Sequence, residues 1–149
     1  MSKKILYLAL SALLCACLSA EAQQTKKVPR IGFLGAAASA SALSRRLDAF
    51  RQGLRELGYV EGKNIVIELR SAEAKLDRLP ALAAELVRLK VDVIVTAGPL
   101  PTRSAKEATS TIPIVMAQDP DPVGTGFVAS LARPGGNITG LSNLRPELS

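Results

Sequence analysis

Short apolar runs alternate with amphipathic stretches over most of this sequence. Short apolar runs predict buried strands at 28–36, 91–97 and 112–117. The second is almost wholly apolar and β-branched, so a central position in the sheet is expected for it. Residues 64–70 alternate polar with apolar side chains, which is typical of a strand at or near a sheet edge. One more short strand is expected at 138–141.

Apolar residues recur at helical spacing between the predicted strands at 28–36 and 64–70. Leu47, Phe50, Leu54 and Leu57 recur three or four residues apart, and Gly58 follows where a helix commonly ends. They predict an amphipathic helix between the first two strands.

Three further helices are expected downstream. Asp77 is a candidate N-cap for a helix that continues to Leu89 with Pro80 early in it, and shorter helices are predicted at 102–109 and 124–132. Such alternation of strands and helices requires right-handed crossovers. The predicted fold class is therefore α/β, a doubly wound, Rossmann-like parallel sheet with helices on both faces.

The first 22 residues have the composition of a secretory signal. Lys3 and Lys4 precede an apolar run at 5–18 and a small-residue end, so cleavage is expected after Ala22 and the product is expected to be periplasmic. The run is shorter than the roughly 20 residues that a membrane-spanning helix needs. Lipoprotein processing at Cys17, which would anchor the chain to the membrane, is the alternative.

Composition fits one globular domain after this leader. The chain has 149 residues, of which 48% are hydrophobic and 3% aromatic. We expect a signal peptide at 1–22, a polar tether at 23–27 and one folded lobe at 28–149.

Histidine is absent from the sequence, and both cysteines lie in the leader. The rest of the chain therefore lacks the side chains for Ser-His or Cys-His nucleophiles and for the usual zinc ligand sets. A binding protein is favoured over an enzyme, and no cofactor is expected.

The formal net charge of +6 does not predict a nucleic-acid partner. Basic residues such as Arg45, Arg46 and Arg51 are interspersed with acids, not with aromatic side chains. A helix face of this kind is ordinarily solvated.

The loops that follow the predicted strands are the best candidates for a site. Residues 35–41, 98–102 and 118–123 are small or polar and lead toward expected helix N-termini, where free N–H groups favour a carboxylate or another anion. We expect these loops to form one wall of a polar cleft. The side chains or N–H groups expected to face a ligand are those of Ser39, Ser41, Gly98, Thr102, Gln118, Asp119 and Val123.

Two carboxylates in the third loop allow other interpretations. Asp119 and Asp121 could hold a divalent cation in a secreted metal-dependent enzyme, or Asp121 could cap the following helix while Asp119 bonds within the turn. Residues 124–129 match the loose dinucleotide pattern G-x-G-x-x-A. They follow the fourth strand, however, and no acidic residue at the end of a next strand completes the fingerprint.

Five motifs together carry a family resemblance. They are VPRIGFLG at 28–35, FRQGLRELGYVEG at 50–62, LDRLP at 76–80, DPVGTG at 121–126 and RPGGNITG at 133–140. In this order they resemble the ABC-transporter substrate-binding proteins of the tryptophan/tyrosine type.

The resemblance implies a periplasmic-binding-protein fold, in which two α/β lobes close about a hinge over a small ligand. It further implies delivery of that ligand, with an amino acid as the first guess, to an ABC permease in the inner membrane. Family chains are longer, so this sequence corresponds to the first lobe with the second lobe missing. A truncated, non-functional fragment is the remaining alternative.

Overall fold

The computed structural model describes residues 27–37 and 39–143 of the chain. Within these ranges, five parallel strands form one sheet in the order β2-β1-β3-β4-β5. The strands are β1 (Arg30–Gly35), β2 (Val66–Ser71), β3 (Val93–Ala97), β4 (Ile114–Asp119) and β5 (Ile138–Ser142). The predicted signal peptide with Cys17, and the tether before residue 27, lie outside the described residues.

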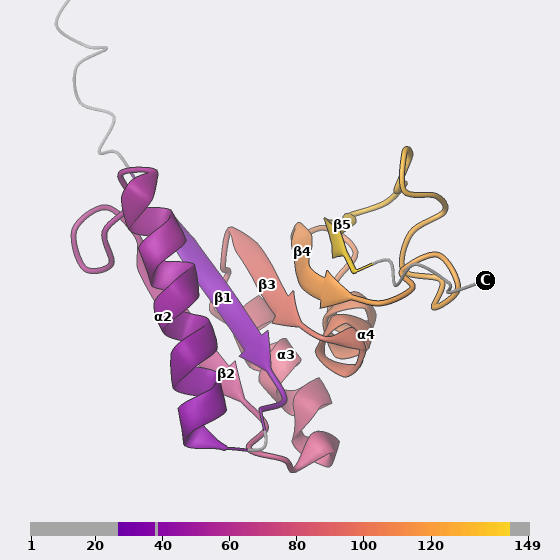
Figure 1. The fold of residues 1–149 in the computed structure, drawn as a ribbon, viewed down its shortest axis with the longest axis horizontal. Helices are drawn as coiled ribbons and strands as arrows, with labels where there is room; N and C mark the ends of the chain where they lie inside the picture. Colours follow the sequence, from indigo (N-terminus) through magenta and orange to yellow (C-terminus); the bar gives the residue numbers. More distant parts are fainter. Residues whose placement is uncertain (1–26, 38, 144–149) are drawn as a thin grey trace, which may run out of the picture.

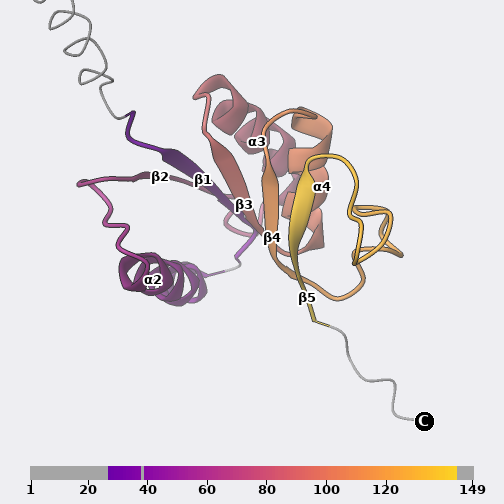
Figure 2. The ribbon, with the colours of Figure 1, turned by 90° about the horizontal axis from the view of Figure 1, so that it is seen from above.

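Helices lie on both faces of this sheet. Figure 2 shows α2 (Ala40–Glu56) on one face and α3 (Leu79–Arg88) with α4 (Pro99–Ala108) on the other. The chain steps from β1 to β2 in one direction and from β3 to β5 in the other, so the strand order reverses between β1 and β3. The predicted doubly wound parallel sheet is confirmed. No helix in the described part of the chain is both long and apolar enough to cross a membrane.

Two apolar layers hold the helices to the sheet. Leu34, Ile94 and Ile114 are fully buried toward α3 and α4. Phe33 and Val95 point to the other face, where Phe33 packs against Phe50 of α2 with ring centroids 5.6 Å apart. This two-sided burial explains why the strands read as nearly continuous apolar runs.

A tight contact fixes the distance between β1 and α3. A Cβ added at Gly32 would lie 3.0 Å from both terminal methyl groups of Leu86, which is itself fully buried. Glycine at position 32 therefore lets the helix approach the sheet more closely than a larger residue would.

Charged groups join the amino ends of β1 and β3. The Asp92 carboxylate accepts hydrogen bonds from the Lys27 ammonium at 2.7 Å and from the Arg30 N–H at 2.8 Å. The Lys27 bond, followed by that of Arg30, lowers the pKa of Asp92 below its usual value. This end of the sheet lies opposite the carboxyl end, where the candidate loops emerge.

The predicted helix at 124–132 is wrong, because this segment is a series of turns. Phe127 and Val128 both donate their N–H groups to the Pro122 carbonyl, and Gly126 adopts φ of 72°. Their side chains are buried in the α3/α4 layer, and Lys106 of α4 donates to the Gly126 carbonyl at 2.6 Å. These longer-range contacts outweigh the weak helical spacing.

Two helix starts also differ from prediction. The helix expected from residue 102 begins at Pro99, since a proline in the first turn has no N–H that needs a partner. Asp77 does not cap α3. It lies inside the short 3-10 turn η2 (Leu76–Arg78), and its side chain makes no capping hydrogen bond.

Truncating Leu86 tests the contact between α3 and the sheet. We expect Leu86→Ala to lower the free energy of unfolding by about 2–5 kcal/mol, because a buried cavity replaces the methyl groups beside Gly32. The matched control, Leu57→Ala, removes a side chain that is 75% exposed and should change stability by less than ~0.5 kcal/mol. Urea unfolding followed by circular dichroism measures both, and equal losses would contradict this packing.

Candidate ligand-binding site

The carboxyl ends of β1, β3 and β4 lie side by side. In the sheet register Gly35 is paired with Ala97, and Ala97 with Gln118. Because these neighbouring strands are parallel, the three candidate loops emerge along one edge of the sheet, as predicted. We call this edge the rim.

A hollow of about 330 Å³ opens on the rim. Its lining comes from α2, the end of β3, the start of α4, the end of β4 with the residue after it, and the residue after β5. It consists of Arg46, Ala97, Gly98, Pro99, Gln118, Pro120 and Asn143. We call it the rim hollow. Gly98 and Gln118 are brought together here, whereas Arg46 and Asn143 were not predicted as site residues. Arg46 is the one charged side chain in this lining.

Ser39 and Ser41 lie farther along the rim, at the start of α2. Ser39 is the N-cap of this helix, and its hydroxyl accepts the Ala42 N–H at 3.2 Å and lies 3.2 Å from the Ser41 hydroxyl. Ser39 lines a second hollow, of about 200 Å³, together with Ser71 and Glu73. The two serines are therefore exposed on the rim but separate from the lining of the rim hollow.

Thr102 does not face the rim, and this expectation is corrected. Its side chain is fully buried, and its hydroxyl donates to the Gly98 carbonyl at 2.9 Å. The same oxygen lies 2.7 Å from the hydroxyl of Thr96 in β3, which must then be the donor in that pair. Thr102 thus braces the turn at Gly98, where φ is 103° and a side chain would be strained.

Asp119 is likewise buried, with none of its surface exposed. One carboxylate oxygen accepts the Asp121 N–H at 2.9 Å, as expected for a bond within the turn, and its carbonyl accepts the Asn143 N–H at 3.0 Å. These bonds join the corner after β4 to the end of β5, which are two walls of the rim hollow. Asp119 thus supports the lining of the rim hollow and is not itself part of it.

A pair of buried oxygens beside this corner has no hydrogen-bond partner among the described residues. They are the second carboxylate oxygen of Asp119 and the hydroxyl of Ser142, and the two residues are paired across β4 and β5. Polar atoms in this situation usually share a water molecule or bond directly after a small rotation.

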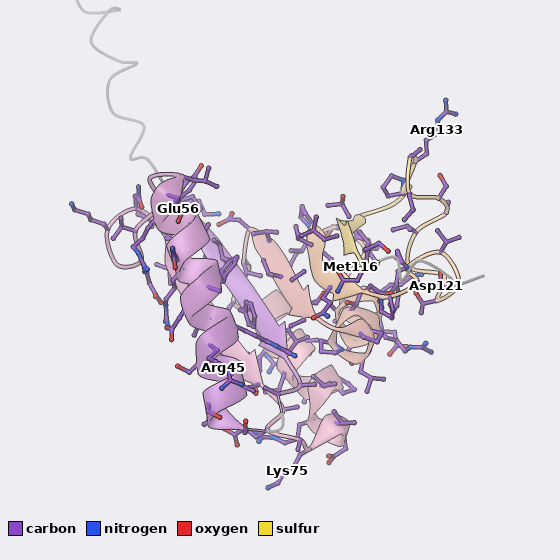
Figure 3. All side chains as sticks on the ribbon, in the orientation of Figure 1. Arg45, Glu56, Lys75, Met116, Asp121 and Arg133 are labelled. Atoms are coloured by element: carbon purple, nitrogen blue, oxygen red, sulfur yellow. The ribbon has the colours of Figure 1, made fainter. Side chains whose placement is uncertain are left out.

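Asp121 caps a turn and not a helix. Its carboxylate accepts the Gly124 N–H at 2.8 Å, and its carbonyl accepts from both the N–H and the hydroxyl of Thr125. Figure 3 shows Asp121 on the segment that follows β4, away from Arg45 on α2. In the described ranges there is no group of three or more His, Cys, Asp or Glu side chains placed to hold a metal ion.

Val123 belongs to a different part of the surface. Its side chain is 44% exposed and lines an open hollow beside Lys106 and Phe127, which does not include the rim loops after β1 and β3. The N–H groups of Gly124 and Thr125 are already bonded to Asp121. This segment therefore offers fewer free donors than a helix N-terminus would.

Two substitutions at Asp119 separate its roles. Asp119→Ala should cost about 1–3 kcal/mol of stability, because the Asp121 N–H loses its acceptor in a partly buried turn. Asp119→Asn keeps that acceptor and adds a donor next to the Ser142 hydroxyl, so its loss should be clearly smaller. Urea unfolding of both variants measures the difference, and an asparagine variant as unstable as the alanine variant would contradict these contacts.

Comparison with known proteins agrees with this architecture. The family model described as ABC transporter substrate binding protein matches residues 35–147. A tyrosine-binding protein of Clostridioides difficile (strain R20291) is 35% identical over 101 residues, which are 68% of this chain and 29% of that protein.

Solved structures of longer proteins show the same fold. A conserved domain protein from Vibrio cholerae O1 biovar eltor has a TM-score of 0.74 and 32% identity, over 80% of this chain and 40% of that one. An ABC domain in complex with L-Trp from Streptococcus pneumoniae has a TM-score of 0.70 and 29% identity, over 76% of this chain and 38% of that one. The chain thus spans less than half the length of these relatives. With three quarters of its length matched by the family model, it belongs to the ABC transporter substrate-binding proteins.

Proposed function

We propose that this chain forms the first ligand-binding lobe of an extracytoplasmic solute-binding protein that serves an ABC importer. The ligand is a small molecule of the amino-acid class, which is released to a permease in the inner membrane. No catalytic role is assigned to the chain.

The rim hollow carries this proposal. Its volume of about 330 Å³ lies in the range of small-molecule sites, roughly 300–1,000 Å³. It lies at the carboxyl ends of parallel strands, near the reversal of strand order between β1 and β3, where open α/β sheets bind ligands. Gln118 and Asn143 contribute amide groups to it, and Arg46 contributes a positive charge.

Related proteins support the ligand class. One relative is named for tyrosine, and one solved structure holds L-Trp. A ligand-free substrate-binding protein of Clostridium difficile, with a TM-score of 0.74 and 28% identity, is described as open. Since this chain covers 40% of that protein, we propose that the rim is one wall of a cleft whose other wall is a second lobe that closes about a hinge.

The remaining residues predicted to contact a ligand are proposed to do so at or beyond the margins of the rim hollow, except for Gly98. Ser39 and Ser41 would meet parts of a ligand that extend along the rim toward β2, and Val123 would meet a ligand only beyond the corner after β4. Gly98 contributes its backbone to the rim hollow.

Replacing the exposed amide of Gln118 tests the proposal. The purified chain should bind L-tyrosine or L-tryptophan in equilibrium dialysis, and Gln118→Ala should weaken that binding by about two- to tenfold through the loss of one hydrogen bond. Gln52→Ala is the matched control, because Gln52 is an exposed glutamine of α2 that bonds to Glu56 and does not line the rim hollow. Absence of binding by the unmodified chain, or equal effects of the two variants, would count against the site.

Export to the periplasm is a separate part of the proposal. It depends on the leader at 1–22, and intact mass spectrometry of protein secreted by a Gram-negative host should give a chain that begins at Gln23. Lipid-modified protein that begins at Cys17, and that disappears in Cys17→Ser, would establish the lipoprotein alternative. Full-length protein retained in the cytoplasm would contradict export altogether.

A further inference from the structure

We propose that Arg46 is the residue by which this lobe selects ligands with a free carboxylate. The inference rests on the proposed amino-acid-binding function and assigns the recognition of one ligand group to one side chain. Arg46 lies on α2, which crosses from β1 to β2, and its side chain lines the rim hollow together with Gln118 and Asn143.

The charge of Arg46 is not used elsewhere in the described part of the chain. Its guanidinium takes part in none of the ion pairs or side-chain hydrogen bonds found there, whereas Arg51 on the same helix is bound to Glu61 at 2.6 Å. The lining of the rim hollow contains no carboxylate. An exposed guanidinium beside two amides is therefore available for a bidentate pair with a planar anion.

Other anion donors on the rim are weaker than the sequence suggests. Pro99 and Pro101 remove two N–H groups from the first turn of α4, and the Thr102 N–H is directed at the Gly98 carbonyl at 3.3 Å. The predicted third helix start, after Asp121, does not exist because that segment forms turns.

The start of α2 is also a poor place for a carboxylate. Ser39 already accepts one of its free N–H groups, and the adjacent hollow is lined by Glu73, whose negative charge would repel an anion. Arg46 is thus the strongest anion-binding group that the described rim offers.

The test compares an amino acid with its amide, which keeps the side chain and the ammonium but lacks the negative charge. Affinities for L-tryptophan and L-tryptophanamide are measured by equilibrium dialysis with labelled L-tryptophan and unlabelled competitors. The unmodified chain should prefer the acid by about ten- to a hundredfold, the size expected for a hydrogen-bonded charge pair. Arg46→Gln should reduce this preference to about twofold or less, because only neutral hydrogen bonds remain.

Two further variants and one further competitor complete the design. Arg46→Lys keeps the charge but not the planar fork, so it should retain an intermediate preference. Arg45→Gln removes the neighbouring exposed arginine, which does not line the rim hollow, and should behave like the unmodified chain. Inorganic phosphate should compete poorly, because the site is proposed to fit a carboxylate attached to an amino-acid ligand.

The outcomes separate this inference from the function on which it rests. An unmodified chain that binds neither L-tryptophan nor L-tyrosine overturns the proposed function, and the inference with it. If the unmodified chain prefers the acid and Arg46→Gln keeps that preference, the inference alone is overturned. It is also overturned if Arg45→Gln lowers the preference for the acid as much as Arg46→Gln does. Competition by phosphate as strong as that by the amino acid would show a general anion site and overturn carboxylate selection.

Discussion

The parallel alignment of β1, β3 and β4 determines where the candidate loops meet. Parallel strands in adjacent positions direct all their carboxyl ends to one edge, and the register carries this order from Gly35 through Ala97 to Gln118. Loops that are separated by tens of residues in the sequence therefore meet on one rim. Figure 1 shows the three strands running in the same direction beside α2.

Buried and partly buried polar bonds hold the rim on both sides of the rim hollow. The hydroxyl pair of Thr96 and Thr102 fixes the turn at Gly98 on one side of the rim hollow. Asp119 joins the corner after β4 to Asn143 on the other side. Thr102 and Asp119, which were predicted to contact a ligand, thus hold the turns on either side of the rim hollow. Gln118, Asn143 and Arg46 line the hollow itself.

Local patterns were sufficient to predict most of the fold. The almost wholly apolar run VDVIVTA predicts a central strand, and alternation at 64–70 predicts a strand at or near the edge. Both predictions are confirmed by the strand order. The pattern failed at 124–132, where the apolar Phe127 and Val128 are buried by packing against distant helices and not by helical periodicity. A single sequence contains no signal for the Lys106 bond that holds this segment to α4.

The site was harder to predict than the fold, for two physical reasons. Arg46 lies in a run of mixed charges that resembles any solvated helix face, and only the crossing of α2 over the sheet brings it next to the corner after β4. Thr102 and Asp119 have the polar side chains of ligand-binding residues. The Thr102 hydroxyl, however, is paired with that of Thr96 in β3, and the Asp119 carboxylate accepts the Asp121 N–H within the turn. Spacing along the chain predicted which edge carries the site but not which side chains face it.

Titration of the isotopically labelled chain with L-tryptophan, followed by NMR, shows at which backbone amides the ligand binds. The largest ¹H–¹⁵N shift changes are expected at Ala97, Gly98, Gln118 and Asn143, with smaller changes around Arg46. Largest changes at the amino ends of the strands, or in the turns at 124–137, would contradict this expectation.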